Sequence, residues 1–146
     1  MKKTGSENAR RVKGFYCAMS GGDWSAARSF LDADIQWVEP NVPGLWFSGT
    51  HYGSDAVFKK IIDVVYDKFE NFHVRMKRVF AVGDHVVALG SFHGRGKTTG
   101  LKLDARVAHV WTLRDGKAIR FQAFHDTLEW QVALGTTSVQ SKLMAA

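Results

Sequence analysis

The sequence predicts one α+β domain in which helices cover one face of a curved, mostly antiparallel sheet. Apolar residues recur at helical spacing only in the first half of the chain, up to about residue 69. An alternating pattern typical of strands begins after Asn71. Gly-Asp at 83–84 and Asp-Gly at 115–116 are hairpin turn pairs that would connect such strands. Helices followed by a run of hairpin-linked strands favour this fold class.

Three helices are predicted in the first half. The first covers residues 6–20 and ends at the glycine pair 21–22, because glycine adopts the positive φ that terminates helices. Asp23 would cap a second helix over 24–31, and Ser54 a third over 55–69. The third helix has the broadest apolar stripe, formed by Val57, Phe58, Ile61, Ile62, Val65 and Phe69.

Five strands and a short final helix are predicted around these helices. The first strand is 35–39, and the other four form a meander over 72–82, 86–95, 101–113 and 118–126. The loop 40–53 is unusually aromatic, so we expect it to fold over an apolar surface. The last helix is expected over 127–134. Both faces of the strand 101–113 are largely apolar, which favours helices on one face and a second subunit on the other, that is, a homodimer through the sheet.

Length and charge limit the function classes. The 146 residues suit a flexible N-terminus over 1–8, a single domain over 9–135 and a tail over 136–146. The net charge of +6 comes from scattered Lys and Arg residues outside any known nucleic-acid module, so we expect no nucleic-acid partner. No segment has the apolar length of a signal peptide or a membrane span. With Cys17 alone, no disulfide is expected, and the cytoplasm is the expected compartment.

Glu39 is the first candidate functional residue. Strand alternation places it on the same face as Ile35 and Trp37, so a carboxylate continues an apolar row. Such an acid either escapes to water at the strand end or is held in a dry pocket, where it can work chemically. The two prolines that follow, Pro40 and Pro43, end the strand at this point.

Five short stretches resemble proteins of one superfamily. They are VKGFYCAMSGGD (12–23), IQWVEP (35–40), GTHYGSDAV (49–57), and HVWTLRDGKAI with FHDT (109–119 and 124–127). Together they resemble nuclear transport factor 2 and ketosteroid isomerase, and the last pair is most similar to the SnoaL-like polyketide cyclase branch. The resemblance covers residues 9–135 and implies the cone-shaped fold of that superfamily. The same fold carries isomerases, cyclases, dehydratases and binding modules.

The resemblance implies two catalytic candidates. In ketosteroid isomerases the acid before the proline is the base, which corresponds to Glu39. Their two oxyanion donors align with Phe15 and Ala108, so steroid isomerisation is not expected. The polyketide cyclase branch instead places an aspartate at Asp126, which the resemblance favours over His125 as the pocket residue. Alternatively, Asp126 caps the final helix.

Two hypotheses follow. The first is a cofactor-independent isomerase, cyclase or dehydratase that uses Asp126 or Glu39 to move a proton on a hydrophobic, carbonyl-bearing molecule. The second is a non-catalytic module that binds a small apolar ligand. No metal site is expected, because His93 and His109 lack a carboxylate at ligand spacing. The residues expected to line the pocket are Tyr16, Trp37, Trp46, His51, Tyr52, Gln122 and Phe124.

Overall fold

The computed structural model describes residues 4–136. Helix α1 (Gly5–Gly21) is capped by the Thr4 hydroxyl at one end and by Gly22, with φ of 71°, at the other. It begins before the expected domain boundary at residue 9, so residues 5–8 belong to the helix, and Asn8 is already buried. The expected tail over 136–146 lies almost wholly outside the described residues. Helix α2 (Trp24–Phe30) is capped by the Asp23 carboxylate, as predicted.

The sheet has six strands within residues 4–136, one more than expected. The additional strand is β2, a short edge strand inside the aromatic segment after residue 40. The sheet order is β2-β1-β6-β5-β4-β3, and only β1 and β6 pair in parallel. The strands are β1 (Leu31–Val38), β2 (Thr50–Tyr52), β3 (Phe69–Val82), β4 (His85–Gly96), β5 (Lys102–Arg114) and β6 (Lys117–His125).

The predicted third helix is present but not regular. It consists of α3 (Ser54–Val57), a π-helical turn η1 (Phe58–Ile62) and α4 (Asp63–Lys68), which follow without a break. Gly53, rather than Ser54, holds the N-cap position, and no side chain caps the helix. A π turn inserts one extra residue and is common at functional sites. Here it carries Ile61 and Ile62 toward the interior of the domain.

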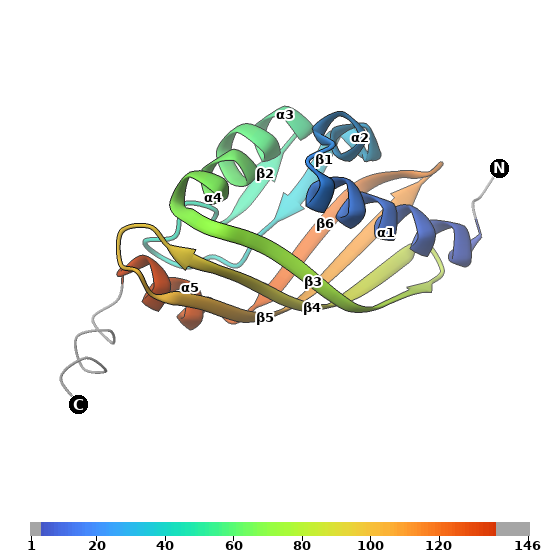
Figure 1. Cartoon of the computed structure of the whole chain (residues 1–146). Helices are drawn as coiled ribbons and strands as arrows, with labels where there is room; N and C mark the ends of the chain where they lie inside the picture. Colours follow the sequence, from blue (N-terminus) through green and yellow to red (C-terminus); the bar gives the residue numbers. More distant parts are fainter. Residues whose placement is uncertain (1–3, 137–146) are drawn as a thin grey trace.

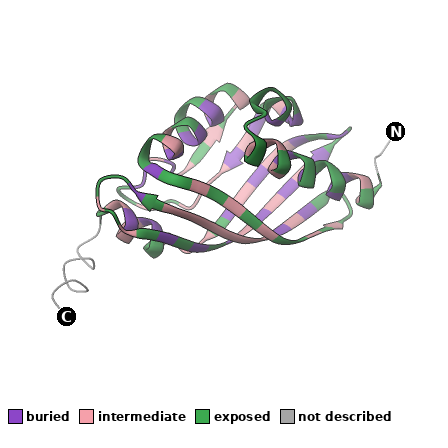
Figure 2. Ribbon diagram, viewed as in Figure 1, coloured by how far each residue is buried: buried purple, intermediate pink, exposed green. Residues whose placement is uncertain are grey.

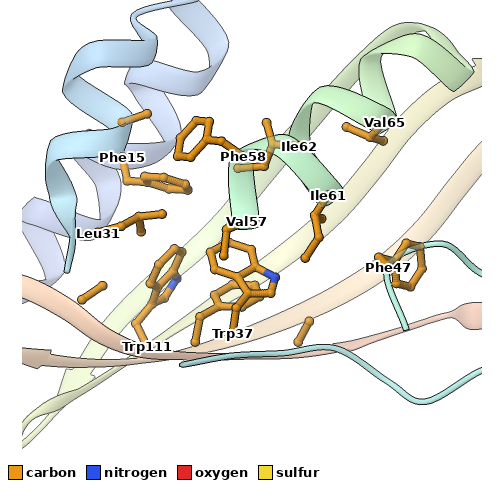
Figure 3. Close-up of a cluster of buried hydrophobic side chains, with 14 of the residues drawn as sticks. Phe15, Leu31, Trp37, Phe47, Val57, Phe58, Ile61, Ile62, Val65 and Trp111 are labelled. Atoms are coloured by element: carbon orange, nitrogen blue, oxygen red, sulfur yellow. The ribbon is translucent and has the colours of Figure 1, made fainter. Parts of the chain in front are cut away.

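Helices α1 to α4 lie on one face of the curved sheet, and α5 (Thr127–Leu134) closes one end (Figure 1). The buried residues lie between these two layers (Figure 2). Trp37 and Trp111 rise from the sheet toward Phe15 of α1 and Ile61 of η1 (Figure 3). The loop before β2 also packs inward, as expected, because Leu45 and Phe47 are buried.

Within residues 4–136, no helix covers the opposite face of the sheet. Phe80 and Phe124 are 38% and 52% exposed there, although both are large apolar side chains. The expectation that helices cover one face is therefore confirmed, whereas a second subunit on the other face stays a prediction. Within residues 4–136, no helix combines the length and apolar character needed to span a membrane.

Candidate active-site cavity

An aromatic cavity of about 320 Å³ lies between the helices and the concave face of the sheet. Its polar groups belong mainly to two clusters, Glu39 with His125 and Tyr16 with His109. Around them the wall is almost entirely apolar, which suits a small apolar ligand. The rings that line the cavity include Phe15, Trp37, Phe72, Phe92, Phe121 and Trp130.

Glu39 is buried and both of its carboxylate oxygens are hydrogen-bonded. It follows β1 directly, and its side chain is 8% exposed. Trp37 Nε1 donates to Oε1 at 2.8 Å, and His125 Nε2 lies 3.2 Å from Oε2. The prediction that Glu39 continues the inward row of β1 is confirmed. The carboxylate does not escape to water, because two side chains with N–H donors hold it inside.

His125 is the partner that completes this cluster. Its side chain is 2% exposed and is surrounded by the rings of Phe47, Phe92 and Trp130, with centroids 5.2, 5.9 and 5.6 Å away. In the neutral ring the nitrogen that faces a carboxylate carries the proton, so Nε2 donates to Glu39 and Nδ1 keeps its lone pair. Nδ1 is buried and has no hydrogen-bond partner among residues 4–136. This is a buried base without a protein partner, beside an apolar cavity.

The second polar cluster consists of Tyr16, His109 and Trp111. Trp111 Nε1 donates to the Tyr16 hydroxyl at 3.0 Å, and that hydroxyl lies 2.7 Å from His109 Nδ1. Burial, together with the nearby His125, lowers the pKa of His109 to about 3. Burial raises the pKa of Tyr16 above its ordinary value, although the Trp111 hydrogen bond opposes this shift. His109 and Tyr16 are therefore both neutral at physiological pH.

Four of the predicted pocket residues border the cavity: Tyr16, Trp37, Glu39 and Trp46. Tyr16 and the preceding residue, Phe15, both border the cavity from α1. Trp46 Nε1 lies 3.4 Å from the carbonyl of Ile61 in the π turn, so the aromatic loop is fixed to the helix above the cavity.

Asp126 does not border the cavity, and the expectation that it rather than His125 faces the pocket is wrong. Asp126 is 40% exposed and pairs with Arg106 at 3.3 Å. It occupies the N-cap position of α5 without a side-chain capping bond. The physical reason is strand alternation, because the buried residues Phe121 and Ala123 share their face with His125.

The same alternation corrects two further expectations on β6. Gln122 and Phe124 lie on the outer face with Asp126 and do not border the cavity. Gln122 instead accepts a hydrogen bond from Arg120 at 3.1 Å. Phe124 is half exposed, opposite Ala108 of β5.

His51 and Tyr52 do not border the cavity either. Both lie on the short strand β2, where Tyr52 is 68% exposed. His51 Nε2 is 2.9 Å from the carbonyl of Phe47. Pairing with β1 therefore keeps these residues at the sheet edge, so they do not form the expected lid.

Sequence reasoning did not select His125, His109 or Trp130. The signal available in the sequence was strand alternation, which puts His109 on the same face as Val107 and Trp111. The structure shows that this face of β5 is the buried, inner one. Ala108, the residue aligned with a family oxyanion donor, lies on the outer face instead. Within residues 4–136, no group of three or more His, Cys, Asp or Glu side chains is placed to hold a metal ion.

The family follows from comparison with known proteins. A SnoaL-like domain model matches residues 12–121. The chain belongs to the SnoaL-like domain family. No curated protein sequence matches it.

Solved structures agree on the nuclear transport factor 2-like fold. An NTF2-like protein from Burkholderia thailandensis is 26% identical, with a TM-score of 0.80 over 87% of this chain and 96% of that one. TerC, co-crystallised with polyporic acid, is 24% identical, with a TM-score of 0.78 over 88% of this chain and 98% of that one. A SnoaL-like protein from Jannaschia is 17% identical, with a TM-score of 0.77 over 94% of this chain and 99% of that one. The predicted superfamily and fold class are confirmed.

Proposed function

We propose that the cavity binds a small, largely apolar, carbonyl-bearing molecule and that His125, held by Glu39, moves a proton on it. The observation that carries this proposal is the buried Glu39–His125 pair at 3.2 Å, beside an aromatic cavity, with the other imidazole nitrogen unpartnered. An unpaired buried acceptor costs roughly 1–3 kcal/mol, so a bound molecule that supplies a hydrogen is favoured there.

The two residues have different roles in this proposal. Glu39 orients the imidazole and fixes its proton on Nε2, as a carboxylate does behind a catalytic histidine. It also stabilises the positive charge that forms when Nδ1 takes a proton. Glu39 is thus the positioning residue and His125 the general base, which revises the sequence-based hypothesis in which Glu39 itself is the base.

The reaction class is an isomerisation, cyclisation or dehydration of a carbonyl compound. A C–H bond next to the carbonyl breaks, the proton moves to His125 Nδ1, and the electron pair spreads onto the carbonyl oxygen. In an isomerisation the imidazolium returns the proton to a conjugated carbon. In a cyclisation the enolate carbon attacks a second carbonyl group of the molecule, whose oxygen takes the proton. In a dehydration the proton goes to a departing hydroxyl group, which leaves as water, so no cofactor enters the balance of any of the three.

The alternative function is a non-catalytic module for a small apolar ligand. The predominance of aromatic rings in the wall favours it, since such a wall binds apolar molecules without any chemistry. The two functions differ in what happens when Glu39 is neutralised: a binding module keeps its affinity, whereas an enzyme loses turnover.

The experiment follows deuterium exchange of the methyl protons of 2-acetylnaphthalene in D₂O by NMR. We expect wild type to accelerate the exchange, Glu39→Gln to lower the rate roughly tenfold or more, and His125→Asn to abolish it, since general base catalysis contributes about 10²–10⁴-fold. Asp126→Asn is the matched control, because it makes the same change in a carboxylate outside the cavity. Loss of exchange in Asp126→Asn but not in Glu39→Gln would contradict the proposal.

The class of partner and the cellular compartment are also proposals. The scattered basic residues and the apolar cavity support a small-molecule ligand rather than a nucleic acid. The free, exposed Cys17 is compatible with a reducing compartment, and the cytoplasm is proposed on that basis.

A further inference from the structure

We propose that His109 is fixed as its neutral Nε2–H tautomer and donates this hydrogen to the carbonyl oxygen of the ligand, so that the cavity selects neutral carbonyl compounds over carboxylates. The inference rests on the proposed ligand site but not on proton transfer by His125. His109 would bind the carbonyl oxygen of the ligand, an interaction that the Glu39–His125 pair does not provide.

The tautomer follows from the donor and acceptor roles along a three-residue relay. An indole N–H can only donate, so the Tyr16 oxygen accepts from Trp111 Nε1. Among residues 4–136, the acceptor within reach of the Tyr16 hydroxyl proton is His109 Nδ1, 2.7 Å away, so donation to Nδ1 is the arrangement that leaves no buried hydroxyl proton unpaired. Because Nδ1 accepts, the proton of a neutral imidazole must be on Nε2. The relay therefore determines which nitrogen of His109 carries the hydrogen.

The charge state agrees with this tautomer. His109 is 5% exposed, and its pKa of about 3 keeps the ring neutral throughout the physiological range. Tyr16 stays protonated because burial raises its pKa. A neutral imidazole donates a hydrogen bond without placing a full charge in an apolar cavity. It can also pair with an oxygen that gains negative charge during reaction.

His109 Nε2 has no hydrogen-bond partner among residues 4–136. The hydrogen bond that His109 forms within residues 4–136 uses Nδ1, whereas the ring itself borders the cavity. Trp130 Nε1 is a second buried donor without an acceptor among these residues, and Trp130 also borders the cavity. Unmet N–H groups in an otherwise apolar wall favour a ligand with a hydrogen-bond acceptor such as a carbonyl oxygen.

The position of His109 suits a molecule that also reaches His125. In the β5–β6 ladder His109 pairs with Ala123, and His125 pairs with Val107, so the two histidines are diagonal neighbours on the inner face. Diagonal side chains in a sheet are about 7–8 Å apart at the backbone. The Phe92 ring contacts both imidazoles, with centroids 5.6 and 5.9 Å away. One small ketone can therefore place its oxygen at His109 and its adjacent carbon at His125.

The absence of cations from the wall determines the selectivity for neutral compounds. No Lys or Arg is among the described residues that border the cavity, and Glu39 contributes a carboxylate. A ligand carboxylate would lose its hydration there without gaining a Lys or Arg partner, and it would lie near the Glu39 carboxylate, which is costly in an apolar site. A ketone meets the two N–H donors without this cost.

The first test measures the tautomer in the ligand-free protein. We expect ¹⁵N NMR of histidine-labelled protein to show a proton on Nε2 of His109 and none on Nδ1 between pH 5 and 8. Tyr16→Phe removes the hydroxyl that binds Nδ1, so we expect a mixture of tautomers in this variant. A wild-type proton on Nδ1, or a ring that becomes charged near pH 6, would overturn the proposal.

The second test compares three ligands of similar shape by tryptophan fluorescence titration: 2-acetylnaphthalene, 2-ethylnaphthalene and 2-naphthoate. In wild type we expect the ketone to bind roughly three- to tenfold more tightly than the hydrocarbon, as one neutral hydrogen bond allows, and the carboxylate to bind most weakly. The infrared carbonyl band of the bound ketone should shift to lower frequency.

Two variants of His109 form a matched pair for this test. His109→Met removes the donor and should abolish both the ketone preference and the infrared shift, whereas His109→Gln restores an N–H donor and should recover part of both. A ketone preference that persists in His109→Met, or is absent in wild type, would overturn the proposal. A His109-dependent preference without deuterium exchange would leave this inference standing and contradict only proton transfer.

Discussion

At the scale of single residues, Glu39 shows what strand alternation can predict and what it cannot. The row of Ile35, Trp37 and Glu39 on one face was readable from the sequence, and Glu39 is indeed buried. Its partner was not readable, because His125 lies 86 positions later in the chain. Alternation also placed His125 with Phe121 and Ala123, but it could not tell which face of β6 would be the inner one. That depended on how β6 packs between β1 and β5.

The buried His109 predicts a pH-dependent stability. Its pKa is about 3 in the native state against 6.5 for an ordinary histidine, so between these values the unfolded chain binds a proton that the native protein does not. The free energy of unfolding therefore falls as the pH is lowered through 6.5. From pH 7 to pH 5 this group should contribute a loss of about 2 kcal/mol.

Urea denaturation of wild type and His109→Gln at pH 7 and pH 5 measures this contribution. The loss should be about 2 kcal/mol larger in wild type, because the variant retains every other titrating group. An equal loss in both proteins would show that His109 is protonated in the native state.

At the scale of elements, the regular patterns were predictable and the irregular ones were not. The bounds of α2 and α5 lie close to the predicted ranges, since a capping Asp23 and a clear apolar run are local signals. The π turn η1 and the strand β2 depend on distant partners. Ile61 in the π turn meets Trp46 of the aromatic loop, and β2 exists only because it pairs with β1.

Because α5 packs closely against β4 at Gly96, we expect any side chain at this position to destabilise the protein. A Cβ there would lie 2.2 Å from the carbonyl oxygen of Ala133 and 2.8 Å from Thr99 Oγ1. Gly96→Ala must therefore displace α5, which carries Trp130 of the cavity wall. We expect a loss of about 1–3 kcal/mol in urea denaturation, as for other overpacked positions, together with weaker binding of 2-acetylnaphthalene.

The control for this substitution is Gly14→Ala in α1. A Cβ at Gly14 meets nothing within 4 Å, so alanine should stabilise the helix by about 0.5–1 kcal/mol. If Gly96→Ala is as stable as wild type and binds the ketone equally well, close packing of α5 on β4 does not position Trp130.

At the scale of the whole molecule, we propose that a second copy of the chain covers the outer face of the sheet. An apolar row crosses three paired strands there, from Phe80 through Val87 to Val110, and a parallel row contains Leu89, Ala108 and Phe124. A two-fold axis would place the same apolar surface of both copies together. Exposed arginines such as Arg106 would remain at its rim.

Light scattering after size-exclusion chromatography tests this assembly. We expect twice the monomer mass for wild type and the monomer mass for Phe124→Arg, since a buried unpaired charge opposes association. Leu128→Arg is the control, because Leu128 is similarly exposed but belongs to α5. A wild-type monomer at high micromolar concentration would contradict the dimer.

The sequence by itself determined the layers of this molecule. Hydrophobic period and turn residues are local properties, and they sufficed for the regular helices, for five of the strands and for placing Glu39 on the same face as Ile35 and Trp37. The resemblance of short stretches added the superfamily, which the match over residues 12–121 confirms.

Only the tertiary structure decided which polar groups meet inside the cavity. The Glu39–His125 pair and the Trp111–Tyr16–His109 relay each join residues from separate elements. Such pairs cannot be recognised from the hydrophobic pattern of the sequence. An apolar residue at the position of either histidine would fit the alternation of its strand equally well. The physical reason is that strand alternation gives a side chain its face, whereas strand order and register give it its partner.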